Sequence, residues 1–187
     1  MSHKQIKWTM FVITAIGNFI AMLDATTVNL ALYPMSQDLH VTMSQIQWAV
    51  IAYMLVLTVF LPFFGKLGDI FPKNKLYSTG FLIFAIGAAL NMTAANFIQL
   101  ISFRCIEALG ATIMLTNAQA IIATIFKNER RGKALGLNGC LVAIGGMSGP
   151  ALGGILINSF GWHAIFAPCI PIALIGAYYA YKMLPSH

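Results

Sequence analysis

The sequence predicts an all-α protein that crosses a lipid bilayer about six times. Hydrophobic residues make up 59% of its 187 residues and charged residues only 9%, whereas a soluble domain carries about 25% charged residues. The apolar runs are roughly 20 residues long and do not alternate with polar residues, a pattern typical of membrane helices and not of barrel strands. A single six-helix transmembrane domain over residues 1–187 is therefore expected.

Short polar connections separate the six predicted helices. The helices cover residues 8–32, 46–65, 76–95, 97–125, 134–157 and 162–183. Each run is long enough to cross a hydrocarbon layer of about 30 Å. Pro34 is expected to mark the end of the first helix, because proline lacks the N–H that a helix interior needs.

The basic residues predict the orientation of the chain. They precede the first helix, follow the second and fourth helices and close the sixth: Lys4, Lys7, Lys66, Lys73, Lys75, Lys127, Arg130, Arg131, Lys133 and Lys182. Short basic loops of membrane proteins stay in the cytoplasm. Both termini are therefore expected in the cytoplasm, with the protein in the inner (plasma) membrane. The net charge of +6 then reflects orientation, and nucleic acid is not an expected partner.

No cofactor or metal site is expected. Cys105, Cys140 and Cys169 lie in separate apolar runs without the CxxC spacing of metal or redox sites. The chain has no phosphate-binding G-x-x-x-x-G-K-[ST] loop, so ATP is not the expected energy source. No nucleophile–base pair stands at membrane depth, which argues against an enzyme.

Three ionisable residues fall inside predicted helices: Asp24, Arg104 and Glu107. At about 1.5 Å per residue, all three lie at similar depths in the middle or outer half of the bilayer. A charge at this depth costs at least a few kcal/mol and suggests a functional site. Because removal from water favours the protonated form of a carboxylate, we interpret the three residues as a proton-coupling site. The alternative is a buried ion pair that only fixes helix packing.

Two further segments carry recognisable patterns. Gly145, Gly149 and Gly153 recur every four residues and predict a close helix–helix contact. The segment 65–75, GKLGDIFPKNK, is predicted to be a cytoplasmic loop. Its Asp69 is expected to cap a helix or to pair with Arg130 or Arg131 of the other basic loop, the alternative being a solvated loop.

The fifth predicted helix resembles the antiporter signature of the major facilitator superfamily. That signature is a glycine, eight residues, a glycine, three residues, Gly-Pro, two residues and Gly-Gly. This chain matches it with Gly136, Gly145, Gly149, Pro150, Gly153 and Gly154.

The first helix carries LDATTVNLAL, which is similar to a motif of the fourteen-helix drug:proton antiporter branch. Asp24, Thr26 and Asn29 are in register, although the proline expected at Tyr33 stands one residue later.

Two other motifs match in part. Gly65 and Asp69 agree with the superfamily's gating motif, but its usual arginine is replaced by Ile70, which leaves Lys73 among the remaining bases. Arg104 and Gly110 agree with an Arg-x-x-Gln-Gly-x-Gly motif of the fourth helix, in which Glu107 replaces the glutamine. The resemblance therefore implies a gating site at Gly65, Asp69, Lys73, Arg130 and Arg131, and an extra acid beside Arg104.

The resemblance covers the whole chain but only the N-terminal six-helix half of the family. Family members enclose substrate between two such halves, each built from two inverted three-helix repeats. It implies proton-coupled efflux of amphipathic or cationic compounds from a cavity lined by Asn29, Trp48, Tyr53 and Met114. The lipid bilayer, protons, the substrate and a second copy of the chain are the expected partners. A separate partner half and a truncated fragment remain alternatives.

Two other functions stay open. One is a non-transporting six-helix scaffold whose glycine stripe binds other helices. The other is uptake of a small nutrient by the same fold, against which the antiporter-like fifth helix argues by resemblance.

Overall fold

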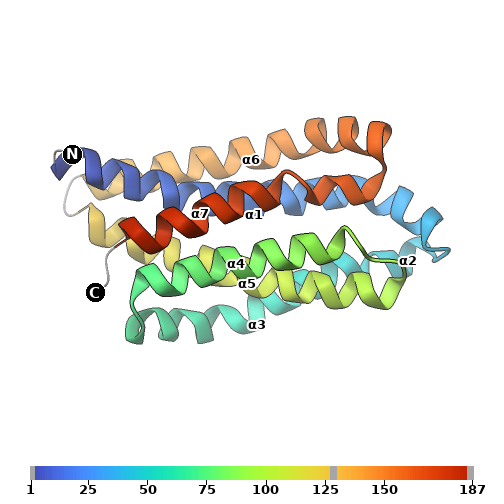
Figure 1. Cartoon of the computed structure of the whole chain (residues 1–187), viewed down its shortest axis with the longest axis horizontal. Helices are drawn as coiled ribbons and strands as arrows, with labels where there is room; N and C mark the ends of the chain where they lie inside the picture. Colours follow the sequence, from blue (N-terminus) through green and yellow to red (C-terminus); the bar gives the residue numbers. More distant parts are fainter. Residues whose placement is uncertain (1–2, 127–129, 185–187) are drawn as a thin grey trace.

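The protein is an all-helical bundle, which confirms the predicted fold class. The structure is a computed structural model that describes residues 3–126 and 130–184. Figure 1 shows the long helices running side by side along one axis. The elements in chain order are α1 (His3–Asp38), α2 (Met43–Ile46), α3 (Trp48–Ile70), α4 (Lys73–Asn91), α5 (Phe97–Ile125), α6 (Arg130–Phe160), the 3-10 helix η1 (Trp162–Phe166) and α7 (Cys169–Met183).

Six stretches of the described chain run along the bundle. Five of them are long and apolar enough to cross a membrane: Ile6–Asp38, Met43–Ile70, Phe97–Ile125, Arg131–Phe160 and Trp162–Met183. The sixth is α4, which begins with the polar residues Lys73, Asn74 and Lys75. Figure 1 shows α4 lying alongside the others over most of their length. The described chain thus has a helix at each of the six predicted positions, five of them long and apolar enough to cross a membrane.

The predicted end of the first helix at Pro34 is wrong. Pro34 lies inside α1, which continues to Asp38. A proline lacks the backbone N–H that would donate to the carbonyl oxygen four residues earlier. The hydrogen bonds of the neighbouring residues can still maintain the helix. Here the Ser36 hydroxyl donates to the carbonyl oxygen of Tyr33 at 2.8 Å, and the Leu39 N–H donates to that of Met35 at 3.0 Å.

The predicted loop 65–75 is mostly helical. Helix α3 continues through Gly65 and Asp69 to Ile70, and α4 begins at Lys73. Phe71 takes an extended conformation (ψ 151°), which the following proline favours. The glycines do not end α3, because the loss of helix propensity, about 1 kcal/mol per glycine, is offset by packing of this helix end against α5, where Gly65 lies near Thr116 and Gly68 near Asn117.

The contacts between helices show the symmetry that two three-helix repeats would have. Helix α1, the first span, packs extensively against α6, the fifth, and α5, the fourth, packs extensively against α3, the second. Helix α4 packs against both α5 and α7. Exchanging spans one to three with spans four to six maps the first pair onto the second, which fits the predicted pair of three-helix repeats.

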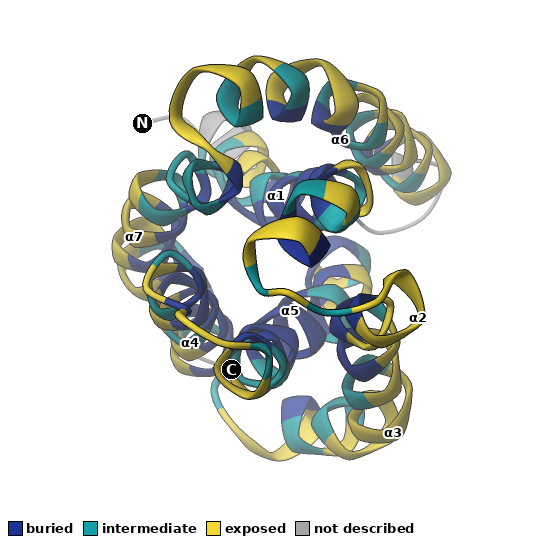
Figure 2. Ribbon diagram, turned by 90° about the vertical axis from the view of Figure 1, so that its right-hand side faces the viewer, coloured by how far each residue is buried: buried dark blue, intermediate teal, exposed yellow. Residues whose placement is uncertain are grey.

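Helices α3 and α6 lie at the edges of the bundle. Only 17% of the most apolar stretch of each is buried, compared with 67% for α1 and 61% for α5. Figure 2 shows α6 and α3 on opposite sides of the bundle, with α1 and α5 between them. The exposed apolar residues of α3 and α6 are therefore available to lipid or to another protein.

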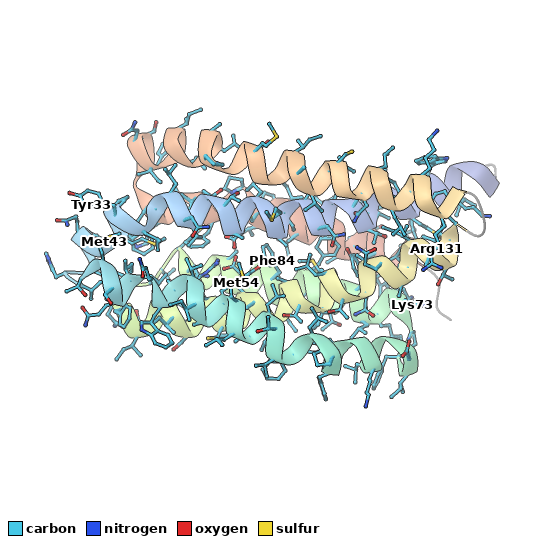
Figure 3. All side chains as sticks on the ribbon, turned by 180° about the vertical axis from the view of Figure 1, so that it is seen from behind. Tyr33, Met43, Met54, Lys73, Phe84 and Arg131 are labelled. Carbon is cyan, nitrogen blue, oxygen red and sulfur yellow. The ribbon has the colours of Figure 1, made fainter. Side chains whose placement is uncertain are left out.

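The described helix ends agree with the predicted sidedness of the basic residues. Figure 1 shows that α1 begins and α7 ends at the end of the bundle where α3 turns into α4. Figure 3 labels Lys73 and Arg131 at this same end. The opposite end carries α2 and η1, where the Trp162 indole N–H donates to Asp38 Oδ2 at 2.8 Å. The assignment of the basic end to the cytoplasm stays a prediction.

Candidate functional site

The three predicted membrane-depth charges meet in one buried cluster. Arg104 Nη1 of α5 donates to Asp24 Oδ2 of α1 at 2.7 Å and to Glu107 Oε2 of α5 at 2.7 Å. Their side chains are between 0 and 1% exposed. One guanidinium nitrogen therefore bridges an acid on another helix and an acid one turn along its own helix.

Two further side chains complete the cluster. The ring centroid of Tyr53, on α3, lies 4.2 Å from the guanidinium carbon of Arg104, and the Nδ2 of Asn91, on α4, donates to Glu107 Oε2 at 2.7 Å. Sequence reasoning placed Tyr53 in a substrate cavity and did not single out Asn91. An amide near the end of an apolar run was the available signal, since such residues form helix–helix hydrogen bonds in membranes.

Several polar atoms in the cluster have no hydrogen-bond partner among the described residues. They are Asp24 Oδ1, Tyr53 OH, Asn91 Oδ1, Arg104 Nε and Glu107 Oε1. Buried polar atoms are nearly always paired in folded proteins, and exceptions need an explanation. Each acid therefore keeps one carboxylate oxygen free to accept a proton while the other oxygen is bound to Arg104.

Close glycine contacts hold the helices around the cluster. Gly87 of α4 lies against the backbone of Glu107, so that a Cβ there would overlap it, and a Cβ at Gly110 of α5 would overlap the backbone of α4. These contacts bring α4 near enough for Asn91 to reach Glu107. Small residues allow membrane helices to approach in this way.

The predicted glycine stripe of α6 packs against α1 beside Asp24. Any Cβ at Gly149 would overlap Thr26, and one at Gly145 would lie 2.7 Å from the carbonyl oxygen of Phe19. The Thr27 hydroxyl also contacts the Gly149 carbonyl oxygen at 3.3 Å. By contrast, a Cβ at Gly136 would meet no described atom within 4 Å. The helix-packing role predicted for Gly145, Gly149 and Gly153 is therefore seen in the structure.

The four residues predicted to line a cavity occupy different environments. Trp48 is 50% exposed, and Asn29 is exposed and donates to the Ala25 carbonyl oxygen of its own helix at 3.1 Å. Tyr53 and Met114 are buried. The four do not form one exposed wall in this structure.

The predicted gating residues gather at the basic end of the bundle without forming an ion pair among the described side chains. The ion pairs of the described chain are both made by Arg104. Lys73 instead donates to Thr124 Oγ1 of α5 at 3.1 Å. Arg131 is exposed, and the side chain of Arg130 lies outside the described residues. The residue of this segment that packs most closely is Gly68, which sequence reasoning missed and which lies against Asn117 of α5.

Comparison with known proteins identifies the family. The sequence profile of the Major Facilitator Superfamily matches residues 14–187. The chain is 44% identical over 180 residues, 96% of its length, to the riboflavin transporter RibZ of Clostridioides difficile. It is 31% identical over 95% of its length to the methylenomycin A resistance protein of Bacillus subtilis, and 32% identical over 92% to the multidrug transporter protein MdtP of the same species.

These relatives are much longer than the chain. The chain spans 40% of the riboflavin transporter, 39% of the methylenomycin A resistance protein and 32% of the multidrug transporter. A solved structure of a proton:xylose symporter superposes with a TM-score of 0.86, at 13% sequence identity, over 99% of this chain and 46% of the symporter. At that identity the superposition shows the fold alone. Family membership points to a membrane transporter and not to an enzyme, and the chain belongs to the major facilitator superfamily.

Proposed function

We propose that this chain is one six-helix half of a proton-coupled exporter of amphipathic or cationic compounds. The observation that carries the proposal is the buried cluster of Asp24, Arg104 and Glu107. In the proposed cycle the cluster binds a proton from one side of the membrane and releases it to the other, while the substrate moves in the opposite direction.

The composition of the cluster favours proton coupling over a purely structural role. A buried ion pair contributes little stability compared with apolar residues of the same size. A second buried acid beside one base adds a further charge that packing alone does not require. Two acids around one arginine are suited to gaining and losing a proton.

Proton exchange requires the cluster to open. The Asp24 side chain is 1% exposed, and its contact with Arg104 joins α1 to α5. Water therefore reaches Asp24 only when these two helices separate. In the proposed cycle the rocking of the bundle against a partner half opens this contact alternately to the two sides.

The gating residues and the glycine motif have supporting roles in the proposal. Gly65, Asp69, Lys73, Arg130 and Arg131 close the cytoplasmic end of the transport path. Gly145, Gly149 and Gly153 of α6 let it pack closely on α1, where Thr27 contacts the Gly149 carbonyl oxygen, and so keep Asp24 at its depth.

The exposed face formed by α1, α3 and α6 is the proposed wall of the substrate cavity. Figure 3 looks onto these helices and shows Tyr33 on α1 and Met54 on α3, with Met43 on the adjoining α2. Asn29 and Trp48 are also exposed, whereas Tyr53 and Met114 would join the wall only after a rearrangement. Met and aromatic side chains suit loose recognition of varied compounds. A second six-helix half completes the cavity, and we propose a second copy of this chain in an inner membrane, with both termini cytoplasmic.

Riboflavin transport is a second candidate. The 44% identity to a riboflavin transporter exceeds the identity of 31 to 32% to the resistance and multidrug relatives described above. This function predicts selectivity for one planar substrate, whereas drug export predicts tolerance of several unrelated ones.

Reconstitution in liposomes tests both functions. The chain is purified, its particle mass in detergent is measured, and movement of riboflavin and of ethidium is followed under an imposed pH gradient. Drug export predicts ethidium movement accompanied by counterflow of protons, both lost in Asp24→Asn. Flux of riboflavin without flux of ethidium would favour the second candidate.

A monomeric particle without flux calls for the same assay after coexpression with a second six-helix half. No flux of either compound in any assembly, together with loss of oligomers in Gly149→Leu, would support the scaffold instead. Asp38→Asn is the matched control, because it neutralises an acid at the opposite end of the bundle, outside both the buried cluster and the gating residues.

A further inference from the structure

We propose that α4 and α7 together bind an anionic phospholipid, with its phosphate between Lys75 and Lys182 and its acyl chains along the two helices. Figure 2 shows α4 and α7 side by side, and the two helices pack against each other. Figure 1 looks onto them, whereas Figure 3 shows the opposite side of the bundle, where α1, α3 and α6 form the proposed substrate wall. A second six-helix half on that wall leaves the α4–α7 face to the lipid.

Each of the two helices has one exposed side. The exposed residues of α4 recur every three or four positions and are Lys75, Thr79, Leu82, Ile86 and Ala89. The exposed residues of α7 are Pro171, Leu174, Ile175, Tyr178, Tyr179, Tyr181 and Lys182. The Thr79 hydroxyl donates to the Lys75 carbonyl oxygen of its own helix at 2.9 Å, so it needs no partner from outside. Each exposed side is therefore apolar toward the middle of the bundle and carries one lysine at its basic end.

The two lysines lie at the same level. Asn74 Nδ2 donates to the carbonyl oxygen of Tyr181 at 3.3 Å, which joins the start of α4 to the end of α7. Lys75 and Lys182 each follow one partner of this hydrogen bond in the chain. Both lysines are exposed, so a single headgroup at this end of the two helices can contact them together.

The charge of this face favours an anion. Neither α4 nor α7 contains an acidic residue. Neither lysine forms an ion pair with a described side chain, and the Lys182 ammonium group lies 5.7 Å from the ring centroid of Tyr178 instead. Basic side chains at a membrane surface attract anionic headgroups. A phosphate between Lys75 and Lys182 supplies the counterion that these two helices lack.

The tyrosines indicate the depth of the headgroup. Tyr178 and Tyr181 are each 60% exposed, and tyrosine is enriched where the hydrocarbon of a membrane meets water. One turn further into the bilayer, Leu174 and Ile175 are 49% and 59% exposed. The molecule that covers this face is therefore anionic at one end and apolar along the rest. A phospholipid has that form, whereas a soluble phosphate compound lacks the apolar part.

Native mass spectrometry tests the preference for an anionic headgroup. The chain, freed of lipid in a neutral detergent, is mixed with equal amounts of phosphatidylglycerol and phosphatidylcholine that carry the same palmitoyl and oleoyl chains. We expect phosphatidylglycerol to be the first lipid bound. In K75Q/K182Q the preference should fall on the order of tenfold, because two basic residues beside the headgroup are lost. Equal binding of both lipids by the wild-type chain would overturn the proposal.

A matched variant separates this site from the general positive charge of the basic end. K66Q/K133Q removes two charges at the same end, but from α3 and α6. It should keep the preference within about twofold, because charges on other faces of the bundle are screened. Equal losses in the two double variants would mean that the lipid responds only to net charge, which contradicts a site between Lys75 and Lys182.

A soluble competitor tests the apolar part of the site. Glycerol 3-phosphate carries the phosphate of the lipid without its acyl chains. An excess of it should leave phosphatidylglycerol bound, because most of the contact with α4 and α7 is apolar. Displacement of the lipid would instead indicate a site for soluble phosphates and would overturn the lipid assignment.

Cross-linking locates the lipid without any substitution. Phosphatidylglycerol with a photoreactive diazirine in one acyl chain is bound to the wild-type chain and activated by light, and the modified peptides are sequenced. Cross-links on α4 and α7 support the site, whereas cross-links mainly on α3 and α6 overturn it. None of these measurements requires transport. The lipid site therefore stands or fails whatever the liposome assay shows for the proposed function.

Discussion

The guanidinium carbon of Arg104 lies 4.2 Å from the ring centroid of Tyr53, and the Tyr53 hydroxyl has no partner among the described residues. The ring and the hydroxyl of this tyrosine therefore have separate roles. The ring supports a buried cation, whereas the hydroxyl makes no described hydrogen bond. A cation above an aromatic face is stabilised by about 2 kcal/mol when both groups are removed from water.

Substitution of Tyr53 should distinguish the ring from the hydroxyl. Tyr53→Phe keeps the ring, and we expect its thermal midpoint in detergent to match the wild type or exceed it. Tyr53→Leu removes the ring and should lower the unfolding free energy by about 2 kcal/mol. Equal losses in both variants would mean that the hydroxyl is paired, and the cation–π contact would then not be the reason for this tyrosine.

Arg104 should contribute far more to the free energy of unfolding when Asp24 and Glu107 are present than when both acids have been replaced. Arg104→Gln leaves Asp24 and Glu107 buried without a base, and removal of one partner of a buried pair costs about 3–5 kcal/mol. The triple variant D24N/R104Q/E107Q carries no charge in the cluster and should recover most of that loss. Thermal unfolding of the two variants gives the comparison.

Lys73→Gln is the control for the loss of a basic residue. Lys73 is only half-buried and donates to Thr124 at 3.1 Å, so its loss should change stability by about 0.5 kcal/mol or less. If the triple variant is no more stable than R104Q, the arginine does not stabilise the protein by balancing the charges of Asp24 and Glu107.

The α6 glycines allow a matched pair of substitutions. Gly149→Ala should be destabilising by about 1–3 kcal/mol, because its Cβ would overlap Thr26 and the close contact with α1 would have to widen. Gly136→Ala places its Cβ where no described atom lies within 4 Å, and its midpoint should stay the same or rise. Equal effects of the two would mean that α6 does not pack against α1 as described.

The sequence predicted which charged residues form the site, but not which neighbouring side chains contact them. Asp24, Arg104 and Glu107 stood out because charge is rare in apolar runs, and their depths along the helices brought them to one level. Asn91 and the ring of Tyr53 were not placed in the cluster because helix periodicity does not say which side chain of a neighbouring helix faces it. That choice depends on close contacts such as that of Gly87 with Glu107, which are properties of packing and not of one segment.

The helix boundaries illustrate the same limit. The span 97–125 was predicted with the bounds that α5 has, and in the structure the Asn96 side chain caps its first turn by accepting from the Gln99 N–H. Pro34 and Gly65 were taken as helix ends because of their local preferences. In the structure, tertiary packing overrides those preferences, and α1 and α3 continue beyond them.

The contact between Asp38 and Trp162 offers a test at the opposite end of the bundle. The Trp162 indole donates to Asp38 Oδ2 at 2.8 Å and so ties the end of α1 to η1. Asp38→Asn and Trp162→Phe should each be destabilising, and their double variant should lose less than the sum, with a coupling energy of about 1 kcal/mol. Trp48→Phe, at an exposed tryptophan, is the control. Its effect should add to that of Asp38→Asn within about 0.5 kcal/mol, whereas additivity of the first pair would mean that the hydrogen bond does not hold α1 to η1.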